Sequence, residues 1–266
     1  MAREWVKTFG RTLAWAVQLF ASVGSGGLSH ARVLPPSVLP GLDPSAAREL
    51  VDGNQPPWGG VVRIQTEVGF QCTGGLIGPR VVLTAAHCLF GHGTGRLVRP
   101  GSIHVLAGYH HGEYAGHARA IAVEVGPGFG IGRDGQKLPL SPVDSDWAIL
   151  TIDNPLGTAD RVLTVTRELP LPGTPAMLGG YEQDRAQVIV ADVACVVVGL
   201  VQDRASHVLL RHSCAATWGA SGAPLLARMS GQNWTVVGVA SVADVGALGG
   251  YAVPIPAIAA HSAALP

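Results

Sequence analysis

The chain has 266 residues, of which 14% are charged, against about 25% in an ordinary soluble domain. Its 18 basic and 18 acidic side chains balance to a formal net charge of zero, so the sequence lacks the clustered positive charge that nucleic-acid binding requires. Glycine (36) and proline (19) are abundant, but the apolar share of 47% excludes a disordered composition. We therefore expect one main domain, rich in turns, with a sizeable core.

The N-terminal residues 1–31 are predicted to be a signal peptide. Three basic residues precede an apolar stretch over residues 13–23, and the small residues Ser29 and Ala31 suit cleavage by a signal peptidase. The stretch is shorter than the roughly 20 apolar residues that a membrane-spanning helix needs. The alternative is an amphipathic or disordered extension. Export would make the protein secreted or periplasmic, with no stable membrane insertion once the signal is removed.

Residues 32–56 are rich in Pro, Ser, Gly and Ala and are predicted to form a leader, a linker or a short pro-segment before a domain over residues 57–266. In that domain, short apolar runs rich in β-branched residues alternate with Gly, Pro and Asp clusters. No long segment has a helical period, so alternating strands and helices are not expected. Strands are expected at 61–65, 81–84, 103–107, 120–125, 147–152, 187–190 and 235–239, and a short helix within 257–264. The pattern indicates an all-β sandwich or barrel.

Four cysteines, at positions 72, 88, 195 and 214, form no C-x-x-C pair, and three disulfide pairings are open from the sequence. Bonds between nearest neighbours would close small loops and contribute ~3 kcal/mol each. Such bonds persist in an oxidising compartment, which agrees with the predicted export. The alternative is four buried free thiols in a cytosolic protein.

Three segments carry residues with catalytic chemistry. The string Cys72-Thr-Gly-Gly-Leu-Ile-Gly-Pro-Arg-Val-Val-Leu-Thr-Ala-Ala-His87-Cys88 ends in a histidine after an apolar strand, Asp146-Trp-Ala-Ile-Leu begins another strand, and Gly219-Ala-Ser221-Gly-Ala-Pro places a serine between glycines. In this order the segments resemble the catalytic segments of the chymotrypsin/trypsin-like serine proteases, over roughly residues 57–260. The resemblance implies an exported, bacterial-type member with two packed six-stranded antiparallel β-barrels and a short C-terminal helix.

The resemblance further implies a monomeric serine endopeptidase that acts on protein or peptide substrates without a cofactor. A serine hydroxyl becomes a good nucleophile only when a base takes its proton, and His87 would be that base for Ser221. Asp146 would fix the imidazole tautomer, and the amides of Gly219 and Ser221 would stabilise the oxyanion. Asp144 is the rival acid, but its Ser-Pro-Val-Asp-Ser context is typical of a turn.

The resemblance also places a substrate pocket beside the serine. None of the matching positions is charged, so a small or apolar side chain is expected before the scissile bond. Asp244 is the exception: if it turned inward, a basic side chain would be preferred. The pocket positions implied by the resemblance are Ala215 at the base, Ser241, Val242 and Ala243 on the strand that pairs with the substrate backbone, and Gly249 or Gly250 on the wall.

Two further features follow from comparison with the family pattern. Digestive members carry Asp directly before the nucleophile, where it pairs with a newly cut N-terminal amine, but this chain has Ala220, so maturation is expected by simple removal of the leader. The resemblance implies one disulfide, Cys72–Cys88, beside the histidine and a second, Cys195–Cys214, near the nucleophile loop. The usual cysteine between the pocket base and the serine is replaced by Thr217.

Two other functions compete with the protease. An α/β-hydrolase would use Ser221, Asp244 and His261 in that order, but it needs Gly-x-Ser-x-Gly, and position 223 is alanine. A catalytically inactive protease homologue that serves as a binding module is the main alternative, although all three triad residues are present.

One cluster of histidines lies outside these motifs. His110, His111 and His117 surround Glu113, but their spacing fits no zinc motif. A solvated surface hairpin is the preferred interpretation, and no metal site is predicted.

Overall fold

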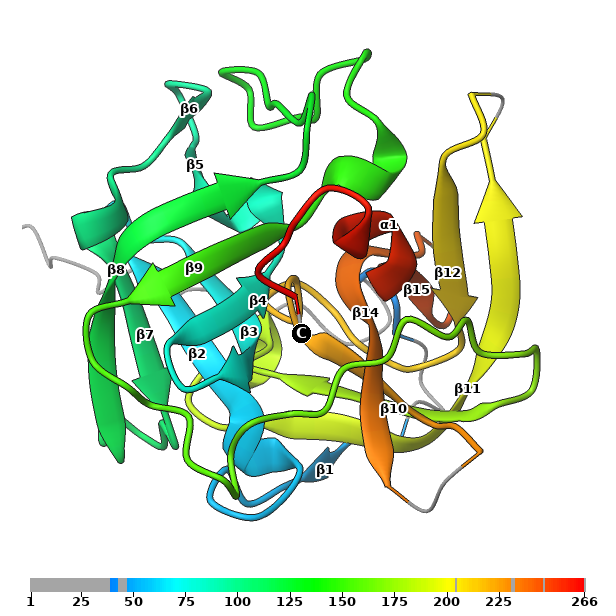
Figure 1. Cartoon of the computed structure of the whole chain (residues 1–266), viewed down its shortest axis with the longest axis horizontal. Helices are drawn as coiled ribbons and strands as arrows, with labels where there is room; N and C mark the ends of the chain where they lie inside the picture. The colour runs from blue at the N-terminus through cyan, green and yellow to red at the C-terminus, as the bar shows by residue number, and fades with distance from the viewer. Residues whose placement is uncertain (1–38, 43–46, 204, 231–232, 246, 266) are drawn as a thin grey trace, which may run out of the picture. The chain divides into compact units, whose positions relative to one another are not determined.

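The computed structural model describes residues 39–42, 47–203, 205–230, 233–245 and 247–265, which belong to one compact unit (Figure 1). The predicted signal peptide therefore lies outside the described residues, as does the start of the predicted linker. In the parts that are described, no helix has the length and apolar character needed to cross a membrane.

The first barrel is a closed sheet of six antiparallel strands in the order β2-β3-β4-β9-β8-β7. Five of its strands contain the β-branched runs that the sequence predicts, whereas the strand over residues 71–78 was not predicted, and apolar side chains are turned inward. A small two-stranded sheet of β5 (Phe90–Gly91) and β6 (Arg96–Leu97) lies outside the barrel. The barrel strands are β2 (Val61–Thr66), β3 (Gln71–Gly78), β4 (Val81–Thr84), β7 (Ile103–Ala107), β8 (Gly116–Val125) and β9 (Ala148–Ile152).

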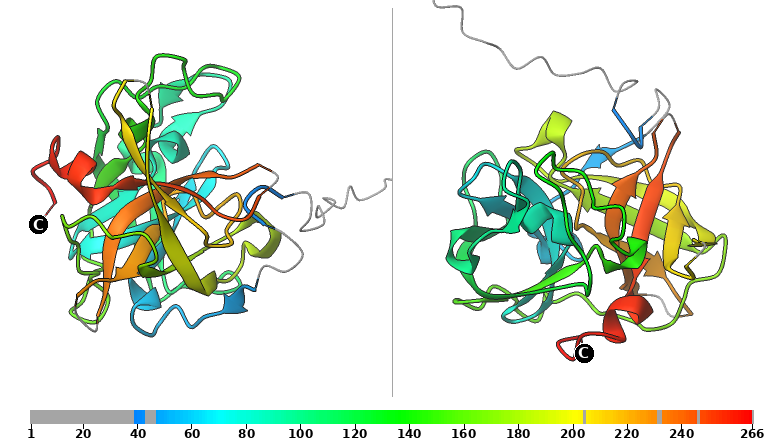
Figure 2. Two further views of the ribbon diagram at one scale, coloured as in Figure 1. Left: turned by 90° about the vertical axis from the view of Figure 1, so that its right-hand side faces the viewer. Right: turned by 90° about the horizontal axis from the view of Figure 1, so that it is seen from above.

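The second barrel has the strand order β11-β10-β13-β14-β15-β12 and closes through pairing of β11 with β12. A short outer strand, β1 (Glu49–Leu50), pairs with β11 and so attaches the predicted linker segment to this barrel. The strands are β10 (Pro175–Gly180), β11 (Val190–Gln202), β12 (Val208–His212), β13 (Pro224–Arg228), β14 (Trp234–Ala243) and β15 (Gly250–Pro254). The two six-stranded antiparallel barrels confirm the predicted fold class (Figure 2).

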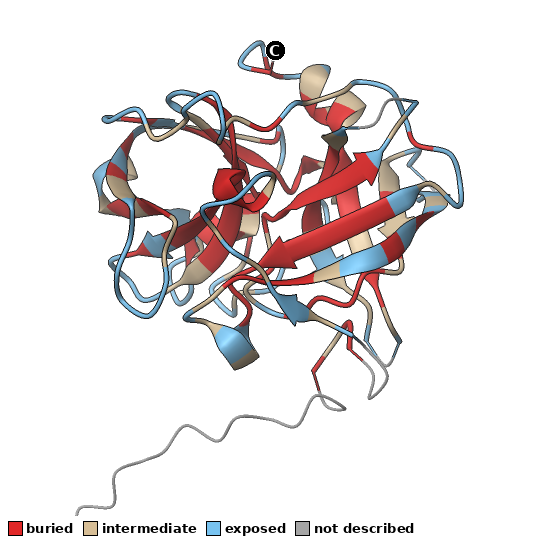
Figure 3. Ribbon diagram, turned by 90° about the horizontal axis from the view of Figure 1, so that it is seen from below, coloured by how far each residue is buried: buried red, intermediate tan, exposed pale blue. Residues whose placement is uncertain are grey.

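The two barrels share one buried core. Leu76 and Val82 of the first barrel belong to the same apolar cluster as Leu226, Val236 and Val253 of the second. Figure 3 shows the buried residues concentrated on the strands, with exposed residues in the connecting loops. Because apolar side chains of both barrels exclude water from this interface, loops that meet over it have a rigid support.

The short helix and the 3₁₀ turns differ in part from the sequence predictions. The only α-helix of the described residues, α1 (Ile255–Ala259), begins earlier than predicted, because Pro256 suits the first turn of a helix. Short 3₁₀ turns are η2 (Trp58–Gly60), η3 (Ala86–Leu89), η4 (Pro100–Ser102), η5 (Val143–Ser145) and η6 (Gln183–Arg185). The strand predicted over 187–190 was wrong except for Val190, since the turn after η6 continues through residues 187–189.

Candidate active site

His87 and Asp146 meet because their strands are neighbours. Thr84, the last residue of β4, lies opposite Ala148, the first residue of β9. The chain therefore leaves β4 towards His87 on the same edge from which it enters β9 after Asp146. His87 Nδ1 lies 2.7 Å from Asp146 Oδ2, and the His87 backbone N–H donates to Asp146 Oδ1 at 2.9 Å. The carboxylate thus holds both the ring and the backbone of the histidine.

The surroundings of this pair favour a negatively charged Asp146 and a positively charged His87. Burial lowers the pKa of His87, but the charge of Asp146 and the hydrogen bond to it raise the pKa by more, so it lies above its usual value. Burial raises the pKa of Asp146. The charge and hydrogen bonds of His87, together with a hydrogen bond from Ser241 Oγ at 2.6 Å, lower this pKa by more, so it lies below its usual value. Asp146 is 5% exposed, whereas the His87 side chain remains 33% exposed towards the pocket.

Asp144, the rival acid, is held elsewhere. Its Oδ2 accepts the backbone N–H of Val208 at 3.4 Å, within the second barrel. The geometry therefore favours Asp146 as the partner of His87.

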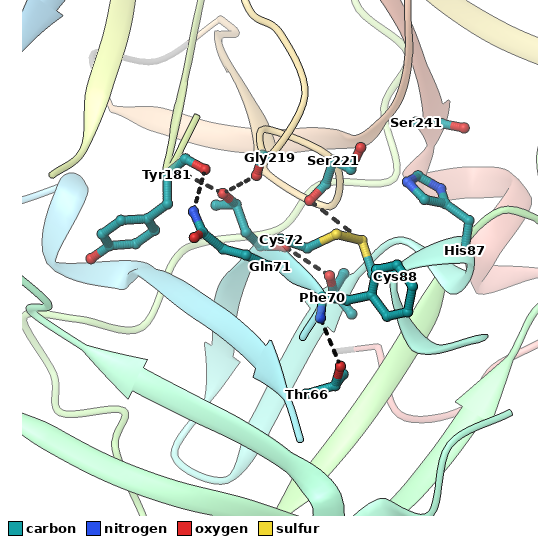
Figure 4. Close-up of a disulfide and its surroundings, with 12 residues drawn as sticks. Thr66, Phe70, Gln71, Cys72, His87, Cys88, Tyr181, Gly219, Ser221 and Ser241 are labelled. Atoms are coloured by element: carbon teal, nitrogen blue, oxygen red, sulfur yellow. Dashed lines mark hydrogen bonds between the residues drawn. A yellow bond between two sulfur atoms is a disulfide. The ribbon is translucent and has the colours of Figure 1, made fainter. Parts of the chain in front are cut away.

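Ser221 lies in the loop between β12 and β13, and its backbone is fixed to the first barrel. Its carbonyl oxygen accepts the Thr73 N–H at 2.9 Å, and Gly222 packs so closely that a Cβ there would lie 2.3 Å from Thr73 O. Gly222 also has a φ of +82°, which favours glycine. Ser221 and His87 line the same pocket, and Figure 4 shows them near each other beside the Cys72–Cys88 disulfide. Within the described residues, no hydrogen bond joins Ser221 Oγ to the His87 ring.

The loop between β12 and β13, residues 213–223, is called the nucleophile loop after the predicted role of Ser221. Its backbone amides near Ser221 divide into those that donate a hydrogen bond to a carbonyl and those that do not. The N–H groups of Ala220, Gly222 and Ala223 donate to the carbonyls of Thr217, Ala240 and Ala220. In the described part of the chain, the N–H groups of Gly219 and Ser221 have no such acceptor. The Trp218 carbonyl, in the same peptide group as the Gly219 N–H, accepts the Gln183 N–H at 2.6 Å. Gly219 and Ser221 therefore have free donors, as an oxyanion hole requires.

A pocket of about 480 Å³ adjoins Ser221 and runs along β14, and Gly219 itself is not among the residues that line it. Of the predicted substrate residues, Ser241, Val242, Ala243 and Gly249 line it, but Ala215 does not. Ala215 is fully buried and packs against Leu39 and Leu42 instead. Three apolar side chains on the pocket wall remain exposed for a ligand, namely Trp218 (49%), Val242 (54%) and Val245 (88%).

Several pocket residues were not predicted from the sequence. Pro40 lines the pocket, because the Gly41 N–H donates to Asp244 O at 2.7 Å and ties this segment to the pocket wall. His212 also lines it, and its Nδ1 is buried without a hydrogen-bond partner among the described residues. Burial lowers the pKa of His212 to about 4, so its ring is neutral at pH 7. His212 lies two residues before Cys214, but it belongs to none of the catalytic strings, so the sequence did not single it out.

Asp244 does not enter the pocket. Its carboxylate pairs with the Arg211 guanidinium at 3.2 Å, and it is not among the pocket-lining residues. This pairing removes the observation that favoured a basic side chain in the substrate.

Both disulfides implied by the resemblance are present. Cys72–Cys88 joins β3 to η3 next to His87, and Cys195–Cys214 joins β11 to the start of the nucleophile loop. The atoms of Cys72, Cys88 and His87 come close enough to suggest a metal site, but both sulfurs are in the disulfide and offer no thiolate. The Cys195–Cys214 bond tethers the residue directly before Ala215.

The predicted histidine cluster lies on a surface hairpin. His110 and His111 fall in the turn between β7 and β8, while His117 Nε2 lies 2.9 Å from His104 Nδ1 on the neighbouring strand. None of these three histidines lines the pocket.

Comparison with known proteins identifies the family of the chain. The trypsin family model matches residues 47–264, so the chain belongs to the trypsin family and is, with that family, a serine-type endopeptidase, a hydrolase. One similar structure is a Glu endopeptidase in complex with MPD, with 20% identity, a TM-score of 0.65, and coverage of 81% of this chain and 95% of that one. Another is the protease Anisep from Arthrobacter nicotinovorans, with 16% identity, a TM-score of 0.57, and coverage of 78% and 93%. Among curated proteins, no sequence gives a significant match.

Proposed function

We propose that this chain hydrolyses peptide bonds of exported or extracellular substrates through an acyl-enzyme intermediate, with Ser221 as nucleophile, His87 as general base and Asp146 as orienting acid. The observation that carries the proposal is the hydrogen bond of 2.7 Å between Asp146 and His87, two residues that line the same pocket as Ser221. In the absence of substrate, catalytic hydrogen bonds are often long and tighten only when the complex forms. A missing Ser221–His87 bond is therefore compatible with this role.

The chemical steps follow from these positions. Ser221 Oγ attacks the carbonyl carbon while His87 Nε2 takes its proton, and the negatively charged Asp146 stabilises the imidazolium that forms. The oxygen of the tetrahedral intermediate accepts hydrogen bonds from the free N–H groups of Gly219 and Ser221. His87 then protonates the leaving amine, the acyl-enzyme forms, and water releases the acyl group by the reverse use of the same groups.

The proposed oxyanion hole gives a prediction at Gly219. Its φ of +95° and the 2.3 Å approach of a built Cβ to Tyr181 O exclude any side chain without movement of the loop. We expect Gly219→Ala to lower kcat by roughly 10²- to 10³-fold, the usual cost of losing one oxyanion donor. Gly173→Ala is the matched control, because Gly173 has a φ of +84° but open space around its Cβ. Equal kinetics for the two variants would refute the role of Gly219.

The pocket walls supply a prediction about substrate preference. Val242, Ala243 and Gly249 carry no charge, and the neutral His212 adds none at pH 7. We therefore expect a small or apolar side chain before the scissile bond.

A peptide-library cleavage profile tests both the activity and the preference. Cleavage after Ala, Val or Leu is the expected result. A profile dominated by Arg or Lys would contradict the uncharged wall of Val242, Ala243 and Gly249 and point to Asp244. One dominated by Glu or Asp would give the selecting role to His212 or to Lys137, which also lines the pocket. Absence of any cleavage would favour the alternative function, an inactive homologue that binds peptides.

A further inference from the structure

A buried cluster of charges lies outside the proposed triad. Arg48, Glu182 and Asp184 have side-chain exposures of 5%, 0% and 9%, and none of them lines the substrate pocket. Arg48 reaches this site from the segment before β1, which falls in the predicted linker. Buried charges are expensive unless they are paired and hydrogen-bonded, so this arrangement needs a compensating function or structure.

The pairing within the cluster is extensive. The Arg48 guanidinium donates to both Asp184 oxygens, at 2.7 and 3.1 Å, and also to Glu182 Oε2. The bidentate contact with Asp184 fixes the plane of the guanidinium as well as its position. Burial raises the pKa of the Glu182 carboxyl, and the nearby Arg48 charge opposes that rise. Asp184 therefore anchors Arg48, and Arg48 in turn holds the Glu182 carboxyl in place.

Glu182 connects this cluster to the nucleophile loop. Its Oε2 accepts the backbone N–H of Thr217 at 3.0 Å. The next residue along each segment repeats the contact, because the Gln183 N–H donates to the Trp218 carbonyl at 2.6 Å. A Cβ on Gly219 would lie 3.1 Å from the Glu182 Cα, so the two backbones are in direct contact. The residues that present the free Gly219 amide are thus held by the segment that Arg48 anchors.

We propose that Arg48 is a positioning residue, which orders the proposed oxyanion hole through Glu182 and Thr217. The effect of Arg48 on catalysis in this proposal rests on the proposed function. Ala220, directly before the nucleophile, carries no charge that could recruit a partner for the loop. The charge that orders the loop comes instead from Arg48, an internal side chain that precedes β1. Any cleavage that matures this protein must then fall before Arg48, because removal of that residue would release the loop.

The first test compares full-length variants by kinetics, with rates normalised to titrated active sites. Arg48→Met is expected to lower kcat at least about tenfold with KM changed by less than about twofold, since oxyanion stabilisation acts on the transition state. Arg48→Lys should restore part of kcat. Asp184→Asn weakens the anchor of Arg48 but leaves the contact of Arg48 with Glu182, so it should lower kcat by less than Arg48→Met does. Arg119→Met is the matched control, because Arg119 faces Glu67 on the first barrel, and it should retain most of kcat. An unchanged kcat in Arg48→Met would overturn the proposal.

The second test needs no catalytic activity. Amide hydrogen exchange at Thr217 is measured in the full chain carrying Ser221→Ala, with and without Arg48→Met or Arg119→Met. We expect Thr217 exchange at least about tenfold faster with Arg48→Met and little changed with Arg119→Met. Unchanged protection of Thr217 would overturn the proposal whatever the kinetics show. Faster exchange in a protein that cleaves no peptide would leave the coupling intact and refute the proposed function instead.

Discussion

Replacing Ser221 with alanine is expected to lower kcat by roughly 10⁶-fold, the loss typical when the nucleophile of a triad is removed. The reason is that the remaining groups can still bind substrate and polarise its carbonyl but cannot form the acyl-enzyme. Hydrolysis of a peptide identified in the library profile provides the measurement. Ser102→Ala is the control, because Ser102 lies in η4 of the first barrel and its hydroxyl donates only to Arg99 O.

The fold should survive this substitution. Within the described residues, Ser221 Oγ makes no hydrogen bond, and the loop is held instead through the Ser221 carbonyl and its Thr73 partner. We expect the thermal midpoint of Ser221→Ala to stay within a few degrees of the wild type. Retention of activity within tenfold of the wild type would remove Ser221 from the mechanism.

Replacing Asp146 with asparagine is expected to lower kcat about 10⁴-fold at neutral pH. An asparagine amide facing Nδ1 favours the tautomer with its proton on Nε2, so the ring can no longer accept the proton of Ser221. The backbone contact from His87 N–H can persist on the asparagine carbonyl, so the geometry should change little. Asp144→Asn is the matched control and should keep nearly full activity.

The pH dependence of the same variants follows from the charges. His87 must be neutral to act as a base, so kcat/KM of the wild type should fall as pH drops through a His87 pKa that lies above its usual value. Asp146→Asn removes the charge that raises this pKa and leaves the burial that lowers it. The acidic limb should therefore move to lower pH in Asp146→Asn and stay in place in Asp144→Asn. Identical limbs in all three proteins would refute the pairing of His87 with Asp146.

The fold and the proximity of His87 to Asp146 could be predicted because the relevant signals are local. The β-branched runs at Val81–Thr84 and Ile103–Ala107 became strands with the predicted bounds. The string ending in His87 and Cys88 indicated the position of the proposed base and of the disulfide beside it. The acidic residue could be chosen from its place directly before a buried strand, and that choice agrees with the geometry.

The remaining features depend on contacts between distant segments. Nothing near Ala215 in the sequence indicates that Leu39 and Leu42 cover it. Arg48 lies 134 residues before Glu182, and neither residue belongs to a motif. Likewise, Ser241 was predicted from the family pattern to contact substrate, yet its hydroxyl donates to Asp146. Such pairings arise only when the second barrel closes and brings its loops to the first.

Covalent labelling tests the central claim most directly. The wild-type protein is treated with a fluorophosphonate reagent, and the modified residue is located by mass spectrometry of peptides. The account predicts labelling at Ser221 alone, much slower labelling in His87→Ala, and none in Ser221→Ala. Failure of the folded wild type to react, or modification of a different serine, would contradict the assignment of His87, Asp146 and Ser221 as a catalytic triad.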